Sequence, residues 1–421
     1  MKNVDLKIAV LRKSRGFTQQ ELADLLGVSF QTVSKWENHV TMPDIIMLPA
    51  LAELFEVSVD ELLGLKPLAE EVYLSRGTAE AGYWEERADW LLRVRKDFWN
   101  EDYLGFLVEK VWKLTDPVSV LDCGCGCGAF GLAALPLLPE GSTYTGIDFV
   151  EKLLETGRQL FDRAGLEGRF VNGDFYAYPV KRTYDLVVCQ CVLRHVNDAE
   201  GFLERMVRHT KPGGLVVCIE VNRELECGGL YVEGMDYGKL CAHEGLKKLW
   251  ACEKKKEGRD WSAAIKAAHM MKRLGLKEIG IRLNDRVHFI SPETEESAQN
   301  VRAQDVRAQD VRAQDGHAQD GHAQGGHAQQ VKDFMEMSGW KAMGGESTER
   351  PEEREPQIRA LMSRGMDRKE ADEFLEQDGR LARFFEKNRD EVSFTRFQGA
   401  LITFGRKEKP AQDASHIGRN A

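Results

Sequence analysis

The residues best suited to chemistry are a glycine-rich turn and the acidic side chains that end neighbouring apolar stretches. In "VSVLDCGCGCGAFG", Asp122 ends the apolar stretch, and Gly124, Gly126 and Gly128 follow at alternate positions. Glycine has no Cβ, so this turn can bend tightly and let a ligand approach the backbone. Asp148 ends the next apolar stretch, "YTGID", where a carboxylate can accept hydrogen bonds from ribose hydroxyls. The pattern predicts a site for a ribose-containing ligand.

Two cofactor classes fit such a turn. Gly124, Gly126 and Ala129 match the dinucleotide pattern G-x-G-x-x-G/A, which keeps a NAD-dependent oxidoreductase open as an alternative. Asp122, however, would repel a pyrophosphate and attract a sulfonium and an amino group. The segment "NGDFY" supplies Asp174 and Phe175, which we expect to meet the edge and the face of an adenine. These features favour S-adenosylmethionine.

In order and spacing, "LDCGCGCG", "GID", "NGDFY", "YDLVVCQCVLRHV" and "TKPGGLVV" resemble the class I S-adenosylmethionine-dependent methyltransferases, over about residues 118–220. The resemblance implies that Asp122 and the glycine turn hold the methionine part of the cofactor. It implies that Asp148 holds the ribose and that Asp174 with Phe175 holds the adenine. Gln190, after the fourth strand, is implied to line the floor near the sulfonium.

The methyl acceptor is less clearly indicated. Candidate substrate-binding residues lie in the aromatic segment and after the fifth strand; they are Tyr103, Glu220, Asn222, Arg223, Asp236 and Tyr237. For each of them an ordinary polar loop or helix position is the favoured interpretation, and no catalytic base can be assigned. The tetrapeptide Asn/Asp-Pro-Pro-aromatic of base-modifying methyltransferases is replaced by "CQCV", so we expect a small-molecule acceptor.

We expect no metal site in this chain. Cys123, Cys125 and Cys127 alternate with the glycines of a turn whose backbone is already committed to the cofactor. The histidines of the C-terminal repeats stand five residues apart, about 140° around a helix, so they do not share one face. His195, in "LRHV", is expected to cap or pack rather than to catalyse.

A second functional region lies near the N-terminus, in "TQQELADLLGVSFQTVSKWENH". Thr18 and Glu21 have the spacing of a capping box at the start of a helix. Gly27 is suited to end that helix, and Ser29 to cap the next one. The inner face of this second helix carries Val33 and Trp36, while its outer face is polar. Two short helices so arranged predict a helix-turn-helix that offers its second helix to the major groove of DNA.

Residues 5–64 closely resemble the Cro/CI-type (XRE) repressor family. The resemblance implies that Phe30, Gln31 and Lys35 occupy base-reading positions. Gln31 can pair with adenine and Lys35 can donate to guanine, whereas Phe30 can only touch a thymine methyl group. We expect phosphate contacts from Arg12, Gln19 and Asn38. Because one such domain reads little sequence, we expect a homodimer on a two-fold site.

Other roles for the two regions stay open. The N-terminal domain carries a slight negative charge, which weakens nonspecific DNA affinity, so it could be a packing module that has lost DNA binding. The fusion could regulate transcription as an enzyme linked to a DNA-binding domain. It could also be a sensor in which cofactor or metabolite binding, without turnover, shifts the affinity for DNA.

The elements that must position these residues alternate between strands and helices from Val118 to Arg223. This alternation predicts an α/β fold with a Rossmann-like, doubly wound and mostly parallel sheet, preceded by a small all-α domain. The stretch "KEIGIRL" is expected to continue the sheet. The stretch "FTRFQGALITFGRK" is expected to complete it as an antiparallel edge strand.

The predicted organisation follows from shifts in composition along the chain. The segments are 1–66 for the helix-turn-helix domain, 67–82 for a linker, 83–116 for an aromatic-rich helical lid, 117–295 for the methyltransferase core, 296–330 for a disordered insertion, 331–408 for the C-terminal helices and final edge strand of the methyltransferase domain, and 409–421 for a tail. The insertion contains six pentads, VRAQD three times and then GHAQD, GHAQG and GHAQQ, which have no apolar face to bury.

Composition limits the class of protein. A chain of 421 residues requires more than one domain, and its net charge of −10 restricts any nucleic-acid contact to a local surface. Its nine cysteines are an odd number and lie mostly in strand-like segments, which favours reduced thiols. No apolar run is long enough to span a bilayer, and charged residues interrupt the N-terminus. We therefore expect a cytoplasmic protein with no membrane partner.

Overall fold

The computed structural model describes residues 4–68, 80–96, 98–236, 240, 244–292, 327, 331, 334 and 351–409. The chain divides into two compact units. Unit 1 consists of Met1–Ser75, His243–Lys256 and Gly339–Arg383, and unit 2 consists of Arg76–Ala242, Glu257–Ser338 and Phe384–Ala421. The chain therefore passes from one unit to the other repeatedly rather than in one step.

Unit 1 begins with five helices, which are α1 (Ile8–Ser14), α2 (Gln19–Leu26), α3 (Phe30–Glu37), α4 (Met47–Phe55) and α5 (Val59–Leu62). The predicted capping box is confirmed, because the side chain of Thr18 accepts from the amide of Glu21 and Glu21 accepts from the amide of Thr18. Gly27 ends α2 with a φ of 67°. The side chain of Ser29 caps α3 by accepting a hydrogen bond from the amide of Thr32. These local signals determine where α2 and α3 begin and end.

The five helices share one apolar core. Val33 and Trp36 of α3 are buried there, together with Leu22 of α2 and Phe55 of α4. Because the buried residues of α3 lie on one side, its other side faces outward. This is the arrangement that a helix-turn-helix requires.

Three later helices also belong to unit 1, namely α13 (Glu244–Glu257), α18 (Pro351–Ser363) and most of α19 (Arg368–Lys387). The sequence placed these segments in the methyltransferase domain, so the structure differs here. Arg359 of α18 donates to Glu61 of α5 at 2.8 Å, and Arg368 of α19 pairs with Glu56. An amphipathic pattern shows that a helix has a buried face but not which partner covers it.

Unit 2 is built on a seven-stranded sheet. Its strands are β1 (Ser119–Cys123), β2 (Thr143–Asp148), β3 (Arg169–Asn172), β4 (Tyr184–Gln190), β5 (Thr210–Val221), β7 (Lys277–Leu283) and β10 (Ala400–Arg406), in the order β3-β2-β1-β4-β5-β10-β7. The strands β1 to β5 are parallel, as predicted. β10 is antiparallel, also as predicted, but it pairs with both β5 and β7 and is not the edge strand.

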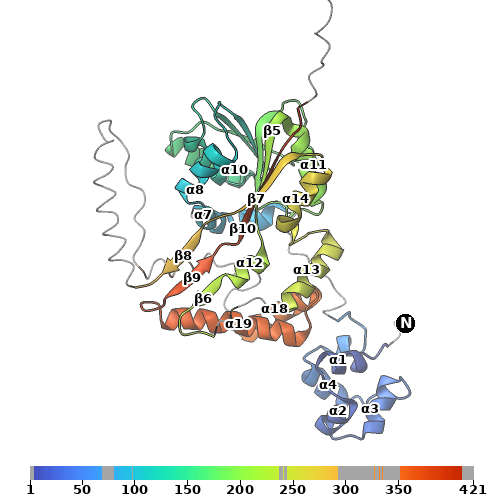
Figure 1. The fold of residues 1–421 in the computed structure, drawn as a ribbon. Coiled ribbons are helices and arrows are strands. Elements are labelled where there is room, and N and C mark those ends of the chain that lie inside the picture. The colour runs from blue at the N-terminus through green and yellow to red at the C-terminus, as the bar shows by residue number, and fades with distance from the viewer. Residues whose placement is uncertain are drawn as a thin grey trace, which may run out of the picture. The chain divides into compact units, whose positions relative to one another are not determined.

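Helices cover both faces of this sheet (Figure 1). One face packs against α8 (Glu101–Phe106), the π-helical turn η2 (Leu107–Val111), α9 (Ala129–Ala134), the short turn η3 (Leu135–Leu137) and α10 (Glu151–Arg163). The other face packs against α11 (Ala199–His209) and α14 (Ala263–Arg273). Successive residues of β1, Val120 and Leu121, point to opposite faces and are both buried. Burial on both faces explains why these strands are continuous apolar runs.

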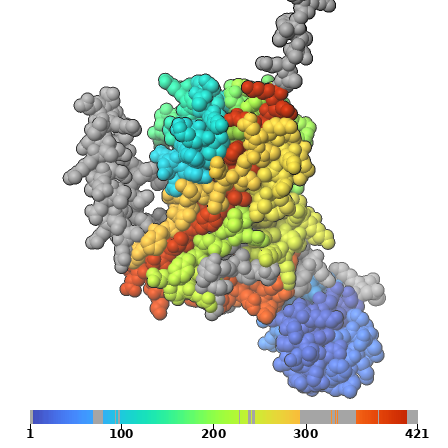
Figure 2. Space-filling view, in the orientation of Figure 1, coloured from blue at the N-terminus to red at the C-terminus, as the bar shows by residue number. Residues whose placement is uncertain are grey.

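A small antiparallel sheet of order β6-β9-β8 was not predicted. It consists of β6 (Leu230–Val232), β9 (Phe394–Phe397) and β8 (Val287–Ile290), and it follows the short helix α12 (Arg223–Gly228). In Figure 2 these three distant parts of the chain lie side by side. The stretch predicted as one final strand is two, β9 and β10. It breaks at Gly399, whose φ is 67° and where a Cβ would come within 2.6 Å of the backbone nitrogen of Glu226.

The repeated pentads lie outside the described residues, except for His327. That side chain is buried, with Nε2 2.8 Å from the carbonyl oxygen of Val392. Seven cysteines, Cys123, Cys125, Cys127, Cys189, Cys191, Cys218 and Cys252, are free thiols. Within the described part of the chain, every helix is too short or too polar to traverse a bilayer.

The packing of α9 against β2 gives a test of this fold. A Cβ at Gly131 of α9 would come within 2.5 Å of the Tyr144 ring and 2.8 Å of the Phe161 ring. We expect Gly131→Ala to destabilise unit 2 by about 1–3 kcal/mol, because overpacking displaces both rings. The measurement is urea unfolding followed by tryptophan fluorescence.

The matched control is Gly105→Ala in α8, where a Cβ would have nothing within 4 Å. That change should leave stability unchanged or raise it slightly, since alanine favours helices. Equal effects of the two substitutions would show that α9 does not pack as described.

Candidate functional site

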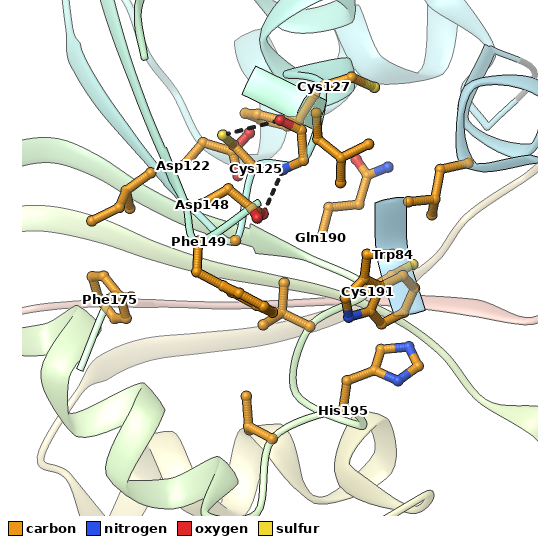
Figure 3. Close-up of a pocket in the computed structure, with 18 of the residues that line it drawn as sticks. Trp84, Asp122, Cys125, Cys127, Asp148, Phe149, Phe175, Gln190, Cys191 and His195 are labelled. Carbon is orange, nitrogen blue, oxygen red and sulfur yellow. Dashed lines mark hydrogen bonds between the residues drawn. The ribbon is translucent and has the colours of Figure 1, made fainter. Parts of the chain in front are cut away.

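A cavity of about 390 Å³ opens at the carboxyl ends of β1, β2 and β4 (Figure 3). This is the edge at which open α/β sheets bind ligands. The predicted cofactor residues that line it are Asp122, Gly124, Gly126, Asp148, Asp174, Phe175 and Gln190. The structure therefore brings together seven of the eight residues singled out in the sequence. The eighth, Gly128, begins α9 just beyond the lining.

The glycine turn has the backbone conformation that its sequence predicts. Gly124, Gly126 and Gly128 have φ angles of 73°, 55° and 74°, a region that side chains with a Cβ rarely adopt. A Cβ at Gly124 would also come within 2.7 Å of Val192, and one at Gly128 within 2.9 Å of Phe161. The absence of side chains is thus required both by the backbone and by packing.

Asp148 connects the turn to the end of β2. Its Oδ2 accepts from the amide of Gly126 at 2.9 Å, and its Oδ1 accepts from the amide of Val150 at 2.9 Å. Burial raises the pKa of Asp148, while these backbone hydrogen bonds lower it. Each oxygen keeps a further lone pair for a ligand hydroxyl. The carboxylate is therefore held in one orientation and can still bind.

Asp122 is the most deeply desolvated acid of the cavity, with 1% of its surface exposed. Its Oδ2 accepts from the Tyr144 hydroxyl at 2.8 Å, and its Oδ1 has no hydrogen-bond partner among the described residues. Burial raises its pKa to about 7, the Tyr144 hydrogen bond opposes this rise, and the charge of Asp148 adds to it. A buried carboxylate oxygen facing a cavity is a site for a ligand cation or donor.

Two phenylalanines line the cavity near its acids, the predicted Phe175 and also Phe149. Phe175 is 5% exposed and packs against Phe202 and His209 in the core, so most of its ring is unavailable to a ligand. Phe149, directly after Asp148, lines the same cavity and is 42% exposed. Sequence analysis missed Phe149, although its place next to the acid that ends β2 could have indicated it.

The opposite end of the cavity is aromatic. Trp84 and His195 meet edge to face, with ring centroids 4.9 Å apart, and both line the cavity. Gln190 lies on the wall between the two ends, and its Oε1 accepts from Trp99 Nε1 at 3.3 Å. His195 was expected only to cap or pack, yet the structure places it in the cavity wall (Figure 3).

Two helices before the sheet supply the rest of this end. Trp84 belongs to α6 (Ala81–Glu85), and Leu91 and Arg95 belong to α7 (Ala88–Lys96); all three line the cavity. The predicted aromatic lid therefore contacts the cavity through α6 and α7. Tyr103 of α8, the lid residue proposed to bind substrate, instead donates to the carbonyl of Leu283 at 2.9 Å. Sequence analysis did not identify Arg95 as a cavity residue, because a single arginine in an amphipathic helix does not indicate a binding site.

The loop after β4 is held by a carboxylate on β5. Glu220 is 1% exposed, and its Oε1 accepts from the amides of Val192 and Leu193, both at 2.7 Å. Cys191, which starts this loop, has a φ of 58°. Burial raises the pKa of Glu220, whereas the charge of Arg194 lowers it. Glu220 is thus a positioning residue for the loop that carries His195.

The other substrate candidates also lie outside the cavity lining. The Asn222 side chain caps α12 by accepting from the amide of Leu225 at 3.0 Å, and Arg223 pairs with Glu226. Asp236 is exposed, and Tyr237 lies outside the described residues. Asn222 and Arg223 follow β5 directly, so they stand at the same edge of the sheet as the cavity.

The outer surface of α3 presents the predicted base-reading residues. Phe30, Gln31 and Lys35 are all exposed, so their side chains are available to a ligand. Asn38 is also exposed, and its amide donates to the carbonyl of Ser34 at 2.7 Å.

Two predicted phosphate contacts are instead engaged inside the domain. The guanidinium of Arg12 binds both carboxylate oxygens of Glu37, at 2.5 and 3.0 Å, and the carbonyl of Phe17 at 2.6 Å. Gln19 donates to the same carboxylate at 2.6 Å. Burial alone would raise the pKa of Glu37, but hydrogen bonds from Arg12 and Gln19 and the charge of Arg12 lower it. These contacts give Arg12 a structural role that sequence spacing could not show.

Two regions of the chain, one in each unit, match known protein families. Residues 120–214 match the family described as "Methyltransferase domain", and residues 8–62 match the family described as "Helix-turn-helix". The chain thus contains a methyltransferase domain and a helix-turn-helix domain, as the sequence predicted. The match favours methyl transfer over the NAD-dependent oxidoreductase that the glycine pattern left open.

Individual relatives are similar over part of their length. The ubiquinone biosynthesis O-methyltransferase of Rickettsia canadensis is 27% identical over 146 residues, which cover 31% of this chain and 61% of the relative. The protein of the same name from Klebsiella pneumoniae is 31% identical over 136 residues, 32% of this chain and 54% of the relative. The chain therefore spans less than two thirds of these relatives. Phosphoethanolamine N-methyltransferase 2 of Haemonchus contortus aligns with a TM-score of 0.38 and 11% identity over 80% of this chain and 60% of that one.

The desolvation of Asp122 predicts a pH-dependent cost in stability. An acid whose pKa is about 7 when folded, against about 3.9 when unfolded, destabilises the fold as pH rises between these values. Asp122→Asn removes the charge. It should therefore stabilise the protein by up to roughly 4 kcal/mol at pH 8 and by less than half as much at pH 5. Urea unfolding at the two pH values measures this difference.

Asp185→Asn is the matched control. Burial raises the pKa of Asp185, but hydrogen bonds from Lys211 and Ser119 outweigh burial and lower it. This substitution should destabilise the protein at pH 8. If Asp122→Asn were also destabilising at pH 8, Asp122 would be stabilised by its surroundings rather than desolvated.

Proposed function

We propose that unit 2 transfers the methyl group of S-adenosylmethionine to a small molecule and that the N-terminal helix-turn-helix binds DNA. The observation that carries the first proposal is the buried, half-satisfied carboxylate of Asp122 beside the glycine turn. It is supported by the match of residues 120–214 to a methyltransferase domain. The relatives named as ubiquinone biosynthesis O-methyltransferases are consistent with a small acceptor.

The lining residues fit this cofactor in both charge and shape. Asp122 Oδ1 would accept from the methionine ammonium group, and Arg95 would pair with its carboxylate. Asp148 would accept from the ribose hydroxyls, and Phe149 would contact the adenine, with Asp174 at its edge. These roles use every charged group of the described lining in a complementary way.

Methyl transfer places a particular demand on the chain. S-adenosylmethionine supplies a methyl group on a positively charged sulfur, and the acceptor must attack that carbon in line. The carboxylates of Asp122 and Asp148 make the cavity favourable for a cation. Trp84 and Leu91 place apolar surface at the mouth, where it excludes water from the bound acceptor. Glu220 holds the loop that forms the facing wall.

A small acceptor suits the dimensions of this site. A cavity of about 390 Å³ lies in the range of small-molecule pockets, and much of it is filled once a nucleoside cofactor is bound. The replacement of the base-modifying tetrapeptide by "CQCV" after β4 supports the same conclusion.

Asp148→Ala tests the enzymatic proposal. Loss of charge-assisted bonds to the ribose should weaken S-adenosylmethionine binding by about ten- to a hundredfold. Calorimetry measures the affinity. Transfer of label from methyl-labelled S-adenosylmethionine into the small-molecule fraction of a bacterial extract measures turnover, which should fall in the variant at limiting cofactor.

Asp162→Ala, on α10, is a control acid outside the cavity lining and should leave both measurements unchanged. Failure of the unmodified protein to bind S-adenosylmethionine or S-adenosylhomocysteine would refute the proposal. Binding without any label transfer would favour a sensor over an enzyme.

DNA binding is supported by the exposed face of α3 and by the family match of residues 8–62. Gln31 and Lys35 lie one helical turn apart, so both can reach base edges in the major groove. We infer that two copies bind a two-fold operator, because one recognition helix contacts too few bases for selectivity.

Gln31→Ala combined with Lys35→Ala should remove selective retention of DNA. Fragments selected from random DNA by the unmodified protein provide the operator, and mobility shifts against unrelated DNA measure selectivity. Each lost base contact should cost about 1–3 kcal/mol of discrimination. Gln20→Ala with Lys66→Ala changes the same residue types outside α3 and serves as control. Undiminished selectivity of the first variant would show that α3 does not read bases.

A further inference from the structure

The carboxyl edge of the main sheet carries the three acids of the cavity over one half and a group of arginines, with the buried acids Glu220 and Glu226, over the other. Over β1, β2 and the segment after β3 it carries Asp122, Asp148 and Asp174, which line the cofactor cavity. The other half is formed by β4, β5, β10 and β7. Each of these four strands has an arginine close to its end at this edge.

The topology places the four arginines there. Arg194 comes four residues after β4 ends, Arg223 two after β5, and Arg286 three after β7. β10 is antiparallel, so its first residue lies at this same edge, paired with the last residue of β5. Arg396 belongs to β9, four residues before β10 begins, and therefore lies close to the same edge.

Three of these arginines, Arg194, Arg223 and Arg396, act on one carboxylate, that of Glu226, and we call these three the cluster. The Glu226 carboxylate binds Arg223 through one oxygen and Arg396 through the other, the latter at 3.3 Å. Burial would raise the pKa of Glu226, but the charges of Arg223, Arg396 and Arg194 outweigh burial and lower it. The Glu226 carboxylate thus orients the guanidinium groups of Arg223 and Arg396, and the charge of Arg194 also stabilises its ionised form.

The cluster already disfavours a further positive charge. His288 lies opposite Arg396 in the pairing of β8 with β9. Burial and the charges of Arg286 and Arg396 lower the pKa of His288 to about 4, so it is neutral near pH 7. Arg286 and Arg396 therefore act on the charge of this neighbouring side chain.

The cluster adjoins the aromatic end of the cavity. Arg194 Nε donates to Nε2 of His195 at 3.1 Å, and His195 lines the cavity beside Trp84. The guanidinium of Arg194 also lies 5.9 Å from the ring centroid of Trp261. A molecule that extended from the methyl-transfer position past His195 would reach the arginines.

We propose that the methyl acceptor is an anion whose carboxylate or phosphate group is bound by Arg194, Arg223 and Arg396, and that the methyl group is transferred to another atom of the same molecule. This inference rests on the proposed methyltransferase function and names its substrate class. The planar guanidinium fork matches carboxylate and phosphate oxygens in pairs, which is why arginine suits such a site. The acids of the cavity would then bind the cofactor, and the three arginines would bind the anionic group of the acceptor.

Calorimetry on the full chain saturated with S-adenosylhomocysteine tests the inference. The probes are benzoate and phenyl phosphate, with benzyl alcohol as their neutral counterpart. We expect each anion to bind at least tenfold more tightly than the alcohol. Whichever anion binds more tightly identifies the group as carboxylate or phosphate.

Three variants separate recognition from structure. Arg223→Gln and Arg396→Gln should each weaken anion binding by about ten- to a hundredfold and leave binding of the alcohol unchanged. Glu226→Gln keeps both arginines and removes their counter-charge, so it should tighten anion binding severalfold. Arg273→Gln, an exposed arginine paired with Glu200, should change nothing.

Two results would overturn the inference. One is equal binding of anions and alcohol, or no binding of either anion, by a protein that binds S-adenosylhomocysteine. The other is loss of all three probes alike in the arginine variants, which would mean that the cluster only supports the small sheet. Absence of heat with S-adenosylhomocysteine itself would overturn the proposed function instead.

Discussion

The site depends on two buried carboxylates, those of Asp122 and Asp148. Among the described residues, the groups that donate hydrogen bonds to them are neutral. Asp122 is 1% exposed and is satisfied on one oxygen only, and Asp148 is held by backbone amides. Removing such groups from water costs free energy, and a cationic ligand offsets that cost when it binds. The same desolvation that weakens the unliganded fold therefore strengthens its interaction with a sulfonium compound. Gly124 and Gly126 make this possible because they bring the backbone against the ligand without adding bulk.

The topology of the sheet determines which charged side chains lie together. All parallel strands end at one edge, so acids after β1 to β3 gather on one side and arginines after β4, β5 and β7 gather on the other. Glu220 and Glu226 have different tasks although both are buried near this boundary. Glu220 holds a loop through its amides, whereas Glu226 orients two arginines. Position along the edge, rather than residue type, determines what each carboxylate does.

Sequence alone identified those parts whose signals are local. The capping box of Thr18, the glycine turn and the acids at the ends of β1 and β2 all lie within a few residues of the elements they define. What the sequence did not show required knowledge of distant partners. Phe175 packs into the core while Phe149 faces the cavity, and both are simply aromatic residues that follow an acid. Arg12 has the spacing of a phosphate contact, but its partner Glu37 lies 25 residues away. Likewise, α18 shows an apolar face without showing that the face belongs to unit 1.

The position of β10 has a consequence for biosynthesis. This strand fills the gap between β5 and β7, yet it is made from residues 400–406, which follow both of those strands in the sequence. While the ribosome is still producing the preceding residues, β5 and β7 each have an exposed edge that can pair with other strands. Domains normally fold as they emerge, but this sheet can close only after residues 400–406 have left the ribosome. Until then β10 cannot cover the edges of β5 and β7, which stay open to pairing with other strands.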